Sequence, residues 1–526
     1  MKSKFLLFTA TLFLLFNFSH AQTPVFVIGK VSYLAVSNGK LFLEAGDNEA
    51  QAQGLWISDG TTAGTKLLKV LDIRTPYFTE YNGKTYFLTK GAESYAELWL
   101  TDGTEIGTRL VKNLKPTNDG SAIVMTAFNN KLYFVAMDAE HGKELWVSDG
   151  TESGTKLFKD INPGVGDSFG YGYAIVYKNK MYFSAKDKQN NEELWVTDGT
   201  EAGTKLFKDI NPDGSSYPSS FNIVNGKLYF NANTANEGTE LWVSDGTEAG
   251  THLVKDVEPK EEIYGPGKTV EYNGKAYFIN HGYKKPYQLW STDGTAAGTV
   301  MVEDSVGNNM VVFNGDLYYS KIVSKKVITY NYALHKTKGK PGEGVLVKVI
   351  SGGNSTDRPL YMVPANGKLY FSCMYDDGGA NYVHMDVWET DGTAANTKLV
   401  EISPGKLVDA NRLVGLKEYN NALYYTDLTS KLYRIGNLNT AVSEIANNNF
   451  EVLLFPNPVS NQLTIRTDVG LIGSNYTVLN IMGQTVLSGK INSDHTLLEV
   501  GNLPGGIYLV QIQSKKGGFT SRFMKE

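Results

Sequence analysis

The chain of 526 residues contains a single cysteine, Cys373, so no disulfide can form within one molecule. It has only seven histidines, and its formal net charge of −5 is small for this length. This charge gives no electrostatic reason to expect nucleic acid or an anionic membrane as a partner. Beyond the N-terminal region, no segment has the ~18 consecutive apolar residues of a membrane helix. We therefore predict no nucleic-acid partner and no transmembrane segment.

The N-terminus has the composition of a signal peptide. Two lysines within the first four residues precede an apolar run over residues 5–18, which is too short to span a bilayer comfortably. Ser19 and Ala21 are the small residues expected at the −3 and −1 positions of a cleavage site. The sequence thus predicts a signal peptide over residues 1–21, cleavage between Ala21 and Gln22, and an exported, soluble mature protein.

All seven tryptophans occur in one recurring motif of the type ELWVSDGTEAGTKL. Successive copies are 43, 47, 49, 47, 48 and 98 residues apart, so the last interval spans two repeats. A period of roughly 40 to 50 residues is typical of propeller and solenoid arrays. Alignment places a histidine and a tyrosine where two repeats lack the tryptophan. This structural repeat column comprises Trp56, Trp99, Trp146, Trp195, Trp242, Trp290, His335, Trp388 and Tyr433.

A second signature precedes each member of this column and consists of two strand-like runs joined by Asn-Gly or a related pair. Such pairs favour a two-residue β-hairpin, because both turn residues need positive φ. Nine of these turns occur, counted without reference to tryptophan. Their first residues are Asn38, Asn82, Asn129, Lys178, Asn225, Asn273, Asn314, Asn366 and Asn420.

Each repeat supplies four short strands: two flanking the Asn-Gly turn, one containing Leu-Trp-Val, and one after Asp-Gly-Thr. Apolar residues run consecutively within these strands, as over residues 132–134, which indicates that both faces of each sheet are covered. Sheets stacked around an axis meet this requirement and leave few long exposed edges. We therefore predict an all-β fold over residues 22–446: a large β-propeller of nine quasi-repeats, with eight or nine four-stranded blades.

The tryptophans are interpreted as scaffold. Burying one of them removes ~150 to 250 Å² from water, an upper limit of roughly 4 to 6 kcal/mol. An aromatic platform for sugars or cations is the alternative, but such a site has no need of repetition in every blade. Likewise Cys373 stands where repeats three, four and five have alanine, which favours a small buried side chain over a reactive thiol.

The DGTEAGT segments are rich in the residue types of phosphate and calcium loops. They lack the spacing and the lysine of a phosphate loop, and one aspartate per turn cannot supply the six or more oxygens that Ca²⁺ takes. Aspartate and threonine side chains bonded to nearby backbone, with glycine at positive φ, account for the segments as loops between strands. The sequence thus predicts no cofactor and no metal ligands.

After three asparagines at residues 447–449 the repeats stop and another all-β pattern begins. Short strands bounded by Gly, Asn and Pro predict a compact β-sandwich over residues 447–526. The expected strands cover residues 452–455, 462–466, 476–481, 485–490, 496–500 and 507–513.

Four segments of this domain, FPNPVSNQLTI, YTVLNIMGQTVLSG, LPGGIYLVQI and GGFTSRFMKE, resemble in order and spacing the C-terminal sorting domain of type IX secretion. The resemblance implies passage across the outer membrane by the type IX secretion machinery, then removal of the domain or surface attachment. It assigns the sorting signal to Pro456, Asn457, Pro458, Gly483, Gly506 and Tyr508. The repeats resemble the ELWxxDGT repeat family of secreted bacterial proteins, which implies a fold more firmly than an activity.

Because strands alternate in direction within a blade, the Asn-Gly and Asp-Gly-Thr turns should share one face. The opposite face collects the loops that vary most between repeats, and variable loops on a rigid scaffold commonly bind ligands. The most individual loops lie in repeats six to eight, at residues 280–288, 320–333 and 374–387. Our hypothesis places a ligand or partner site at Tyr283, Lys284, Lys285, Lys325, Lys326, Tyr375, Asp376, Asp377, Tyr382 and His384. The alternative is that these are solvated loops of a drifting repeat.

Three classes of function remain open. The first is a non-catalytic binding, adhesion or surface scaffold protein whose partner is an extracellular protein or a glycan. The second is an extracellular propeller hydrolase or lyase acting on polysaccharide or peptide, and the third is a structural matrix protein. The enzyme class has little support, because most acidic residues recur once per blade and His141, His281 and His384 lie in different repeats. No catalytic residue is therefore predicted.

Overall fold

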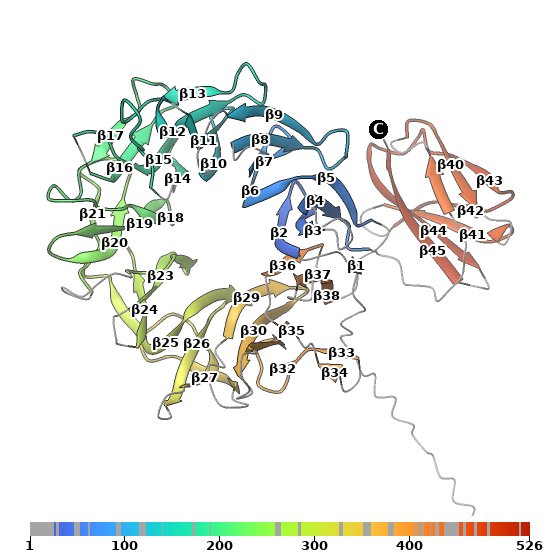
Figure 1. Ribbon diagram of the computed structural model, residues 1–526. Helices are drawn as coiled ribbons and strands as arrows, with labels where there is room; N and C mark the ends of the chain where they lie inside the picture. Colours follow the sequence, from blue (N-terminus) through green and yellow to red (C-terminus); the bar gives the residue numbers. More distant parts are fainter. Residues whose placement is uncertain are drawn as a thin grey trace, which may run out of the picture. The chain divides into compact units, whose positions relative to one another are not determined.

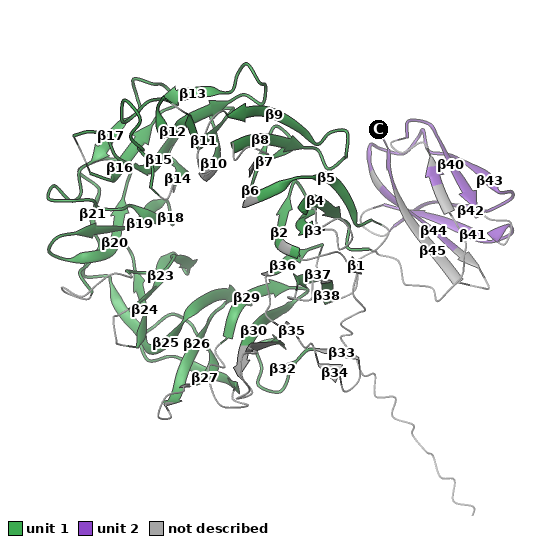
Figure 2. Cartoon of the chain, viewed as in Figure 1, with its two compact units in different colours: residues 1–436 green, residues 437–526 purple. Residues whose placement is uncertain are grey.

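The computed structural model consists of β-strands joined by turns, and its described part contains no α-helix (Figure 1). Two compact units divide the chain, Met1–Gly436 and Asn437–Glu526 (Figure 2). No helix in the described part is long and apolar enough to cross a membrane. The predicted signal peptide and the predicted boundary at 446/447 lie outside the described residues. Those described are 26–27, 31–46, 53–61, 64–90, 96–114, 123–138, 140–170, 174–189, 191–257, 265–281, 286–325, 330–350, 359–376, 383–403, 406–407, 410–411, 415–420, 422–426, 431–435, 452–455, 459–467, 471–480, 484–514 and 517–525.

Five four-stranded antiparallel sheets come first in the first unit, each with its strands in chain order. Repeat one forms β2 (Val31–Ser37), β3 (Lys40–Gly46), β4 (Gln53–Ser58) and β5 (Lys66–Val70). Repeats two and three form β6 (Asp72–Tyr81), β7 (Lys84–Lys90), β8 (Ala96–Thr101), β9 (Arg109–Leu114), β10 (Ile123–Phe128), β11 (Lys131–Asp138), β12 (Gly142–Ser148) and β13 (Lys156–Lys159). Repeats four and five form β14 (Ala174–Tyr177), β15 (Lys180–Ala185), β16 (Glu193–Thr197), β17 (Lys205–Lys208), β18 (Ser219–Val224), β19 (Lys227–Thr234), β20 (Gly238–Ser244) and β21 (His252–Leu253).

The later repeats depart from this pattern. Repeats six and seven share a seven-stranded sheet of β22 (Val270–Tyr272), β23 (Lys275–Asn280), β24 (Tyr287–Thr292), β25 (Val300–Phe313), β26 (Asp316–Lys325), β27 (Tyr330–Thr337) and β28 (Val345–Ile350). Repeat eight forms β29 (Pro359–Ala365), β30 (Lys368–Asp376), β31 (Val383–Thr390) and β32 (Lys398–Leu399), with β35 (Ala410–Asn411) also paired to β31. The hairpin of β33 (Glu401–Ser403) and β34 (Lys406–Leu407) follows, and the last sheet has the order β1 (Phe26–Val27), β38 (Lys431–Ile435), β37 (Ala422–Thr426) and β36 (Gly415–Tyr419).

The nine predicted two-residue turns are confirmed by their backbone geometry. All nine first residues have positive φ, between 46° and 49°, from Asn38 through Lys178 to Asn420. The second residue is also at positive φ in the eight turns in which it is described, including the non-glycine Asn130 and Asn179. These angles match the twist of a two-residue β-hairpin, so the count of repeats made from the turns reflects real local structure.

The sheets of the first unit follow one another around a ring, in which the innermost strands of most successive repeats are in contact (Figure 1). The ring closes where β2 contacts β36 and where Tyr419 and Tyr424 pack with Leu34 in one buried cluster. In addition, Arg434 Nη1 donates a hydrogen bond to the Gly60 carbonyl oxygen at 3.3 Å. The first unit is therefore an all-β, propeller-like assembly made largely of four-stranded sheets.

Two details differ from the prediction that every repeat supplies its own four separate strands. In the last sheet the outermost strand is β1, in which Phe26 pairs with Leu432 and Val27 with Lys431. This pairing uses the N-terminal segment to cover the free edge of β38. In repeats six and seven, the single strand β25 serves both as the outer strand of one repeat and as the inner strand of the next.

The second unit contains two antiparallel sheets. One has the order β39 (Val452–Phe455), β40 (Gln462–Thr467), β43 (His495–Glu499), and the other β42 (Thr485–Lys490), β41 (Asn475–Leu479), β44 (Gly506–Ser514), β45 (Gly517–Lys525). Side chains of both sheets, such as Ile465 and Val510, share one buried cluster, which is the core arrangement of a β-sandwich. The six expected strands all occur, and β45 is a seventh that the strand pattern did not predict.

The nine members of the structural repeat column occupy the same register in their sheets. Each lies opposite the third residue of the preceding strand's apolar run, as in the pairs Phe134–Trp146 and Phe230–Trp242. The two departures keep this register, since His335 lies opposite Tyr319 and Tyr433 opposite Tyr425. Trp146 belongs to a buried cluster made mainly by the preceding repeat, so this side chain joins neighbouring sheets.

Candidate functional site

The Asn-Gly and Asp-Gly-Thr turns lie on one face, as predicted. Lys178, within the turn of repeat four, donates from Nζ to the Asp245 carbonyl oxygen of repeat five at 2.7 Å. Lys227, just after the turn of repeat five, reaches the Asp293 carbonyl oxygen of repeat six at 2.8 Å. These hydrogen bonds join each turn to the next repeat, so this regular face belongs to the scaffold.

The Asp-Gly-Thr loops satisfy their own polar groups, which confirms the interpretation made from the sequence. Asp198 Oδ1 accepts from the Thr200 amide at 2.9 Å and from Thr200 Oγ1 at 2.7 Å. Thr200 Oγ1 in turn accepts a hydrogen bond from the Gly203 amide at 2.9 Å, and Gly199 has φ of 92°. The hydrogen bonds from Thr200 lower the pKa of Asp198, so this carboxylate is ionised and engaged within its own loop.

Substitution of Gly203, the second glycine of this loop, tests how closely the loop packs on Asp198. A Cβ placed on Gly203 would lie 2.1 Å from Asp198 Oδ1, whereas repeat eight has Asn396 at this position, with Nδ2 donating to Asp391 Oδ2 at 2.6 Å. We expect Gly203→Ala to displace the carboxylate and lower the free energy of unfolding by about 1–3 kcal/mol. Gly203→Asn should cost less, because its amide can replace the hydrogen bond. Urea denaturation of both variants checks this, and equal losses would contradict it.

On the opposite face, the glutamate two residues before the tryptophan holds the connection to the next repeat. Glu144 is fully buried and accepts from the Ile161 amide at 2.8 Å, from the Asn162 amide at 3.2 Å and from Ser168 Oγ. Three donors converging on one carboxylate fix the loop after β13 against the edge of repeat three. We call this arrangement the glutamate clasp.

The glutamate clasp recurs in repeat four, whereas the corresponding side chains of repeats two and six contact a tryptophan. Glu193 accepts from the Ile210 amide at 2.8 Å and from the Ser216 amide at 3.0 Å. In repeat two, Glu97 instead accepts a hydrogen bond from Trp99 Nε1 at 2.8 Å. In repeat six, Gln288 Oε1 accepts a hydrogen bond from Trp290 Nε1 at 3.1 Å. The same position therefore binds either the inter-repeat loop or the tryptophan of its own strand.

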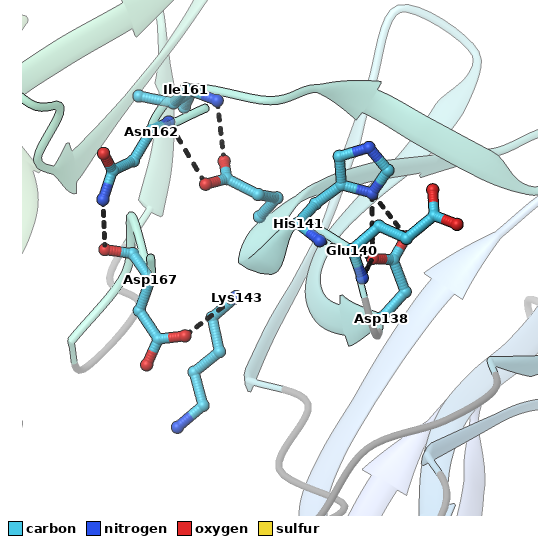
Figure 3. Close-up of polar contacts among 8 residues, drawn as sticks. Asp138, Glu140, His141, Lys143, Ile161, Asn162 and Asp167 are labelled. Atoms are coloured by element: carbon cyan, nitrogen blue, oxygen red, sulfur yellow. Dashed lines mark hydrogen bonds and ion pairs between the residues drawn. The ribbon is translucent and has the colours of Figure 1, made fainter. Parts of the chain in front are cut away.

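A second group of polar side chains surrounds the clasp of repeat three (Figure 3). His141 Nδ1 lies 2.8 Å and 2.9 Å from the two carboxylate oxygens of Asp138, and the Lys143 amide donates to Asp167 Oδ1 at 2.9 Å. The loop that carries His141 packs closely on the inter-repeat loop, since a Cβ on Gly142 would lie 2.8 Å from the Gly166 carbonyl oxygen. Two variable loops thus form one ordered surface.

The electrostatics of this group favour a charged pair beside a poorly solvated acid. The hydrogen bond that His141 donates to Asp138 raises the pKa of His141. Burial acts to raise the pKa of Asp138, but hydrogen bonds from His141 and the loop amides outweigh it and lower that pKa. Burial raises the pKa of Glu144 to about 7, against the three hydrogen bonds it accepts. An imidazole held by a carboxylate leaves its other ring nitrogen for an incoming hydrogen-bonding group.

The raised pKa of Glu144 predicts a dependence of stability on pH. An acid whose pKa is higher in the folded state stabilises the fold fully below its unfolded pKa, near 4.5, and the contribution is lost as the pH rises to about 7. Glu144→Gln mimics the protonated acid and should remove this component, worth up to about 3 kcal/mol. Urea midpoints of both proteins between pH 4.5 and 8 measure it. Parallel pH profiles would contradict the prediction.

An exposed aromatic side chain follows the clasp of repeat four. Tyr217 comes directly after Ser216, has φ of 48° and is 56% exposed. In repeat three the corresponding residue, Phe169, is buried and its ring lies 5.7 Å from that of Phe183. A bulky residue at positive φ is strained, and such strain is often found at functional sites. Tyr217 therefore presents its side chain to solvent from a backbone position at positive φ.

Four of the ten predicted ligand-binding residues lie in the part of the chain that the structure describes. Tyr283, Lys284, Lys285, Lys326, Asp377 and Tyr382 lie outside the described residues. Lys325 is at the end of β26, and Tyr375 and His384 are paired across β30 and β31, with Asp376 next in register. The backbone thus brings two of these residues together. The hypothesis that the ten form a site stays a prediction.

Sequence reasoning missed the glutamate clasp, the Asp138–His141 pair and Tyr217. The glutamate recurs two residues before tryptophan, which was a visible signal that strand alternation places both on one side of the sheet. Nothing in the motif showed which donors it would meet. Of the sorting-signal residues, Tyr508 is buried and donates to the Pro504 carbonyl oxygen at 2.8 Å, and Gly506 has φ of 155°. Pro456, Asn457, Pro458 and Gly483 lie outside the described residues.

Comparison with known proteins assigns the second unit. Residues 453–526 match the family model of the secretion system C-terminal sorting domain. The protein is therefore secreted or located at the cell surface, and its tail addresses the type IX secretion system. No curated protein matches the sequence significantly.

Three solved structures match large parts of this chain at low sequence identity. PorZ, a surface component of the type IX secretion system of Porphyromonas gingivalis, is 12% identical, with 96% of this chain and 100% of PorZ covered and a TM-score of 0.20. Puromycin hydrolase is 12% identical, and the match covers 68% of this chain and 61% of the hydrolase with a TM-score of 0.35. BamB of Moraxella catarrhalis is 11% identical, and the match covers 69% of this chain and 96% of BamB with a TM-score of 0.35. The chain thus spans less than two thirds of the hydrolase, and at these TM-scores no conclusion is drawn from any of the three.

Proposed function

We propose that this protein is a non-catalytic, type IX-secreted binding or adhesion protein, in which a nine-bladed propeller of the ELWxxDGT repeat type presents variable loops on one face. The observation that carries the proposal is the sorting domain at residues 453–526. In this proposal the signal peptide is cleaved between Ala21 and Gln22, and the sorting domain then directs passage across the outer membrane. The partner is an extracellular protein or a glycan.

The nine-blade count rests on the turns and on the register of the repeat column. The first residues of nine two-residue turns have matching φ, and nine residues of the column occupy corresponding positions. Repeats six and seven count as two blades, because β25 pairs with β24 through its first half and with β26 through its second. The strand β1 then supplies the outer strand of blade nine.

The assignment of binding to the variable face rests on the contrast between the two faces. The regular face is occupied by turns whose donors and acceptors bond to each other, as at Asp198 and Lys178. The other face presents ordered loops with groups turned to solvent, including the partly exposed His141 and the strained Tyr217. Rigid presentation of an aromatic side chain reduces the entropy lost on binding.

Loop exchange tests the binding proposal. Residues 280–288, 320–333 and 374–387 are replaced by the corresponding loop of repeat four, and Tyr217→Ala is made separately. We expect loss of binding to one or more components of a glycan array or of the total secreted protein fraction. Exchange of the Asp-Gly-Thr loop of repeat four for that of repeat five is the matched control, because it alters only the regular face. Unchanged binding in all the variable-face variants would refute the proposal.

Export is tested with a reporter. The signal peptide, a soluble reporter and residues 437–526 are joined, and a second fusion omits residues 453–526. In a host with type IX secretion, the first fusion should reach the medium or the cell surface and the second should remain in the periplasm. Equal distributions would remove the basis of the proposal.

A further inference from the structure

The interior of repeat seven departs from the repeat pattern at three positions. His335 replaces the tryptophan of the structural repeat column. Lys321 stands where repeats three, four and five have an alanine that is 0% exposed. Glu303, on the strand that leads into repeat seven, stands where repeats one to five have lysine. A titratable side chain thus enters a column otherwise filled by tryptophan or tyrosine, with two unusual charges in the same part of the ring.

These side chains meet across three neighbouring strands. Lys321 on β26 forms an ion pair with Oε1 of Glu303 on β25. The other carboxylate oxygen of Glu303 accepts a hydrogen bond from Tyr319 Oη at 3.1 Å. On β27, the ring of His335 lies 5.9 Å from the ring of Tyr319, measured between centroids. We call Glu303, Tyr319, Lys321 and His335 the repeat-seven polar cluster.

His335 is the member of the cluster whose polar atoms are unsatisfied. Its side chain is 9% exposed, and neither ring nitrogen has a hydrogen-bond partner in the described part of the chain. The carboxylate of Glu303 is already engaged by Tyr319 and Lys321. An imidazolium ion has two N–H donors, and burying it without acceptors costs more than burying the neutral ring. The surroundings therefore favour the neutral form of His335.

The charges around His335 act in the same direction. Burial and the positive charge of Lys321 lower the pKa of His335, and the negative charge of Glu303 offsets them only in part. On its own strand, the neighbouring Lys336 is paired with Asp316. From β28, the residue in register with His335 is the apolar Leu346. Protonation of His335 thus places a second positive charge beside Lys321, with one shared carboxylate.

The strand that carries Glu303 also joins repeat six to repeat seven. β25 pairs with β24 at Glu303 and Val306, and it pairs with β26 at Val306 and from Met310 onward, with a shift of register within each pairing. Ser305 lies within the first shift and has φ of 54°. A residue other than glycine is strained at positive φ, and a bulge interrupts the ladder of hydrogen bonds. The junction between the two repeats is therefore a weak point two residues from the cluster.

We propose that the repeat-seven polar cluster is an acid-sensitive switch, in which protonation of His335 releases repeat seven from repeat six at the bulged junction in β25. A proton from the solvent binds a ring nitrogen, and the buried imidazolium then stands beside the Lys321 ammonium. Opening the junction exposes His335 to water and relieves both the burial and the repulsion. The switch concerns the interior of the ring and does not depend on what the variable face binds.

The direction of the pH dependence follows from the two states of His335. In the open junction its pKa is near the ordinary 6.5, whereas the closed junction keeps this pKa lower. The open form therefore binds more protons as the pH falls below about 6.5, so acid favours opening. Above that pH both forms hold a neutral imidazole, and His335 no longer affects the equilibrium.

Hydrogen exchange of the mature full chain at pH 7 and pH 5 tests the proposal. Wild-type rates are divided by those of His335→Trp at the same pH, which cancels the intrinsic pH dependence of exchange. We expect this ratio to rise about tenfold between pH 7 and pH 5 for amides of β25 to β27. The ratio for β14 to β17 should stay constant.

Two further variants support this comparison. His335→Gln, which also cannot titrate, takes the place of His335→Trp if the larger ring prevents folding. His252→Gln is the matched control, because His252 is exposed at the start of β21, and this variant should keep the wild-type response. A ratio that is the same at both pH values would overturn the proposal, and so would acid opening that persists in the variants at position 335.

Nuclear magnetic resonance of the histidine rings measures the titration itself. The signal of His335 is the one missing from His335→Gln, and its midpoint should lie below 6.5. Lys321→Ala restores the alanine of repeats three to five and removes the repelling ammonium, so it should raise the midpoint of His335. A wild-type midpoint at or above 6.5, or one that Lys321→Ala does not raise, would contradict the switch.

Discussion

Trp242→Ala is expected to lower the free energy of unfolding by about 3–5 kcal/mol. Trp242 is 8% exposed, lies 6.5 Å from the ring of Phe230 and belongs to the buried cluster shared with Leu194 of the preceding repeat. Truncation would leave a cavity between two sheets that can only partly close. Urea denaturation followed by circular dichroism measures the loss.

Phenylalanine substitutions separate packing from hydrogen bonding in this prediction. Trp242 Nε1 is buried without a hydrogen-bond partner in the described part of the chain, so Trp242→Phe should cost much less than Trp242→Ala. Trp99 Nε1 donates to Glu97, and Trp99→Phe should therefore cost about 1–3 kcal/mol more than Trp242→Phe, since it leaves a carboxylate oxygen short of a donor. Equal effects of the two phenylalanine variants would contradict this account of the column.

Replacing Phe26 and Val27 by two prolines should open the ring at its closure. These residues form β1, which pairs with Lys431 and Leu432 of β38. Proline has no amide hydrogen to donate to the ladder, so the outer edge of β38 would be left uncovered. We expect hydrogen exchange of amides in β36 to β38 to become at least about tenfold faster, as local opening replaces global unfolding.

Two alanines at the same positions provide the control for this experiment. Alanine keeps the backbone donors, so exchange in β36 to β38 should remain slow. Exchange in β14 to β17, a sheet distant in the chain from the closure, should be unaffected by either change. Exchange in β38 that does not respond to proline would mean that β1 does not hold the ring closed.

Much of the fold could be predicted because its signals are local. Asn38 and the other eight turn residues indicate their hairpins because the turn requires positive φ, which few residue types adopt readily. The strand after Asp-Gly-Thr is likewise marked by a self-contained loop, in which Asp198 and Thr200 satisfy neighbouring groups. Such features need no information about distant residues, so one sequence is enough to find them.

Features that depend on distant pairing could not be predicted in this way. Phe26 gives no sign that it will pair with Leu432, because two strand residues outside the repeat carry little pattern. The fusion of repeats six and seven through β25 and the donors that meet Glu144 also arise from tertiary packing. The variable-face hypothesis selected loops for their unusual sequence, whereas the glutamate clasp and the Asp138–His141 pair lie in repeats three and four, where the sequence is most regular.

Cell fractionation tests the central claim most directly. The full chain and a chain ending at residue 452 are expressed in a bacterium with an active type IX secretion system, and each is quantified in the periplasm, at the cell surface and in the medium. The account predicts that the full chain leaves the periplasm while the shortened, still folded chain accumulates there. A shortened chain that reaches the surface or the medium as efficiently as the full chain would contradict it.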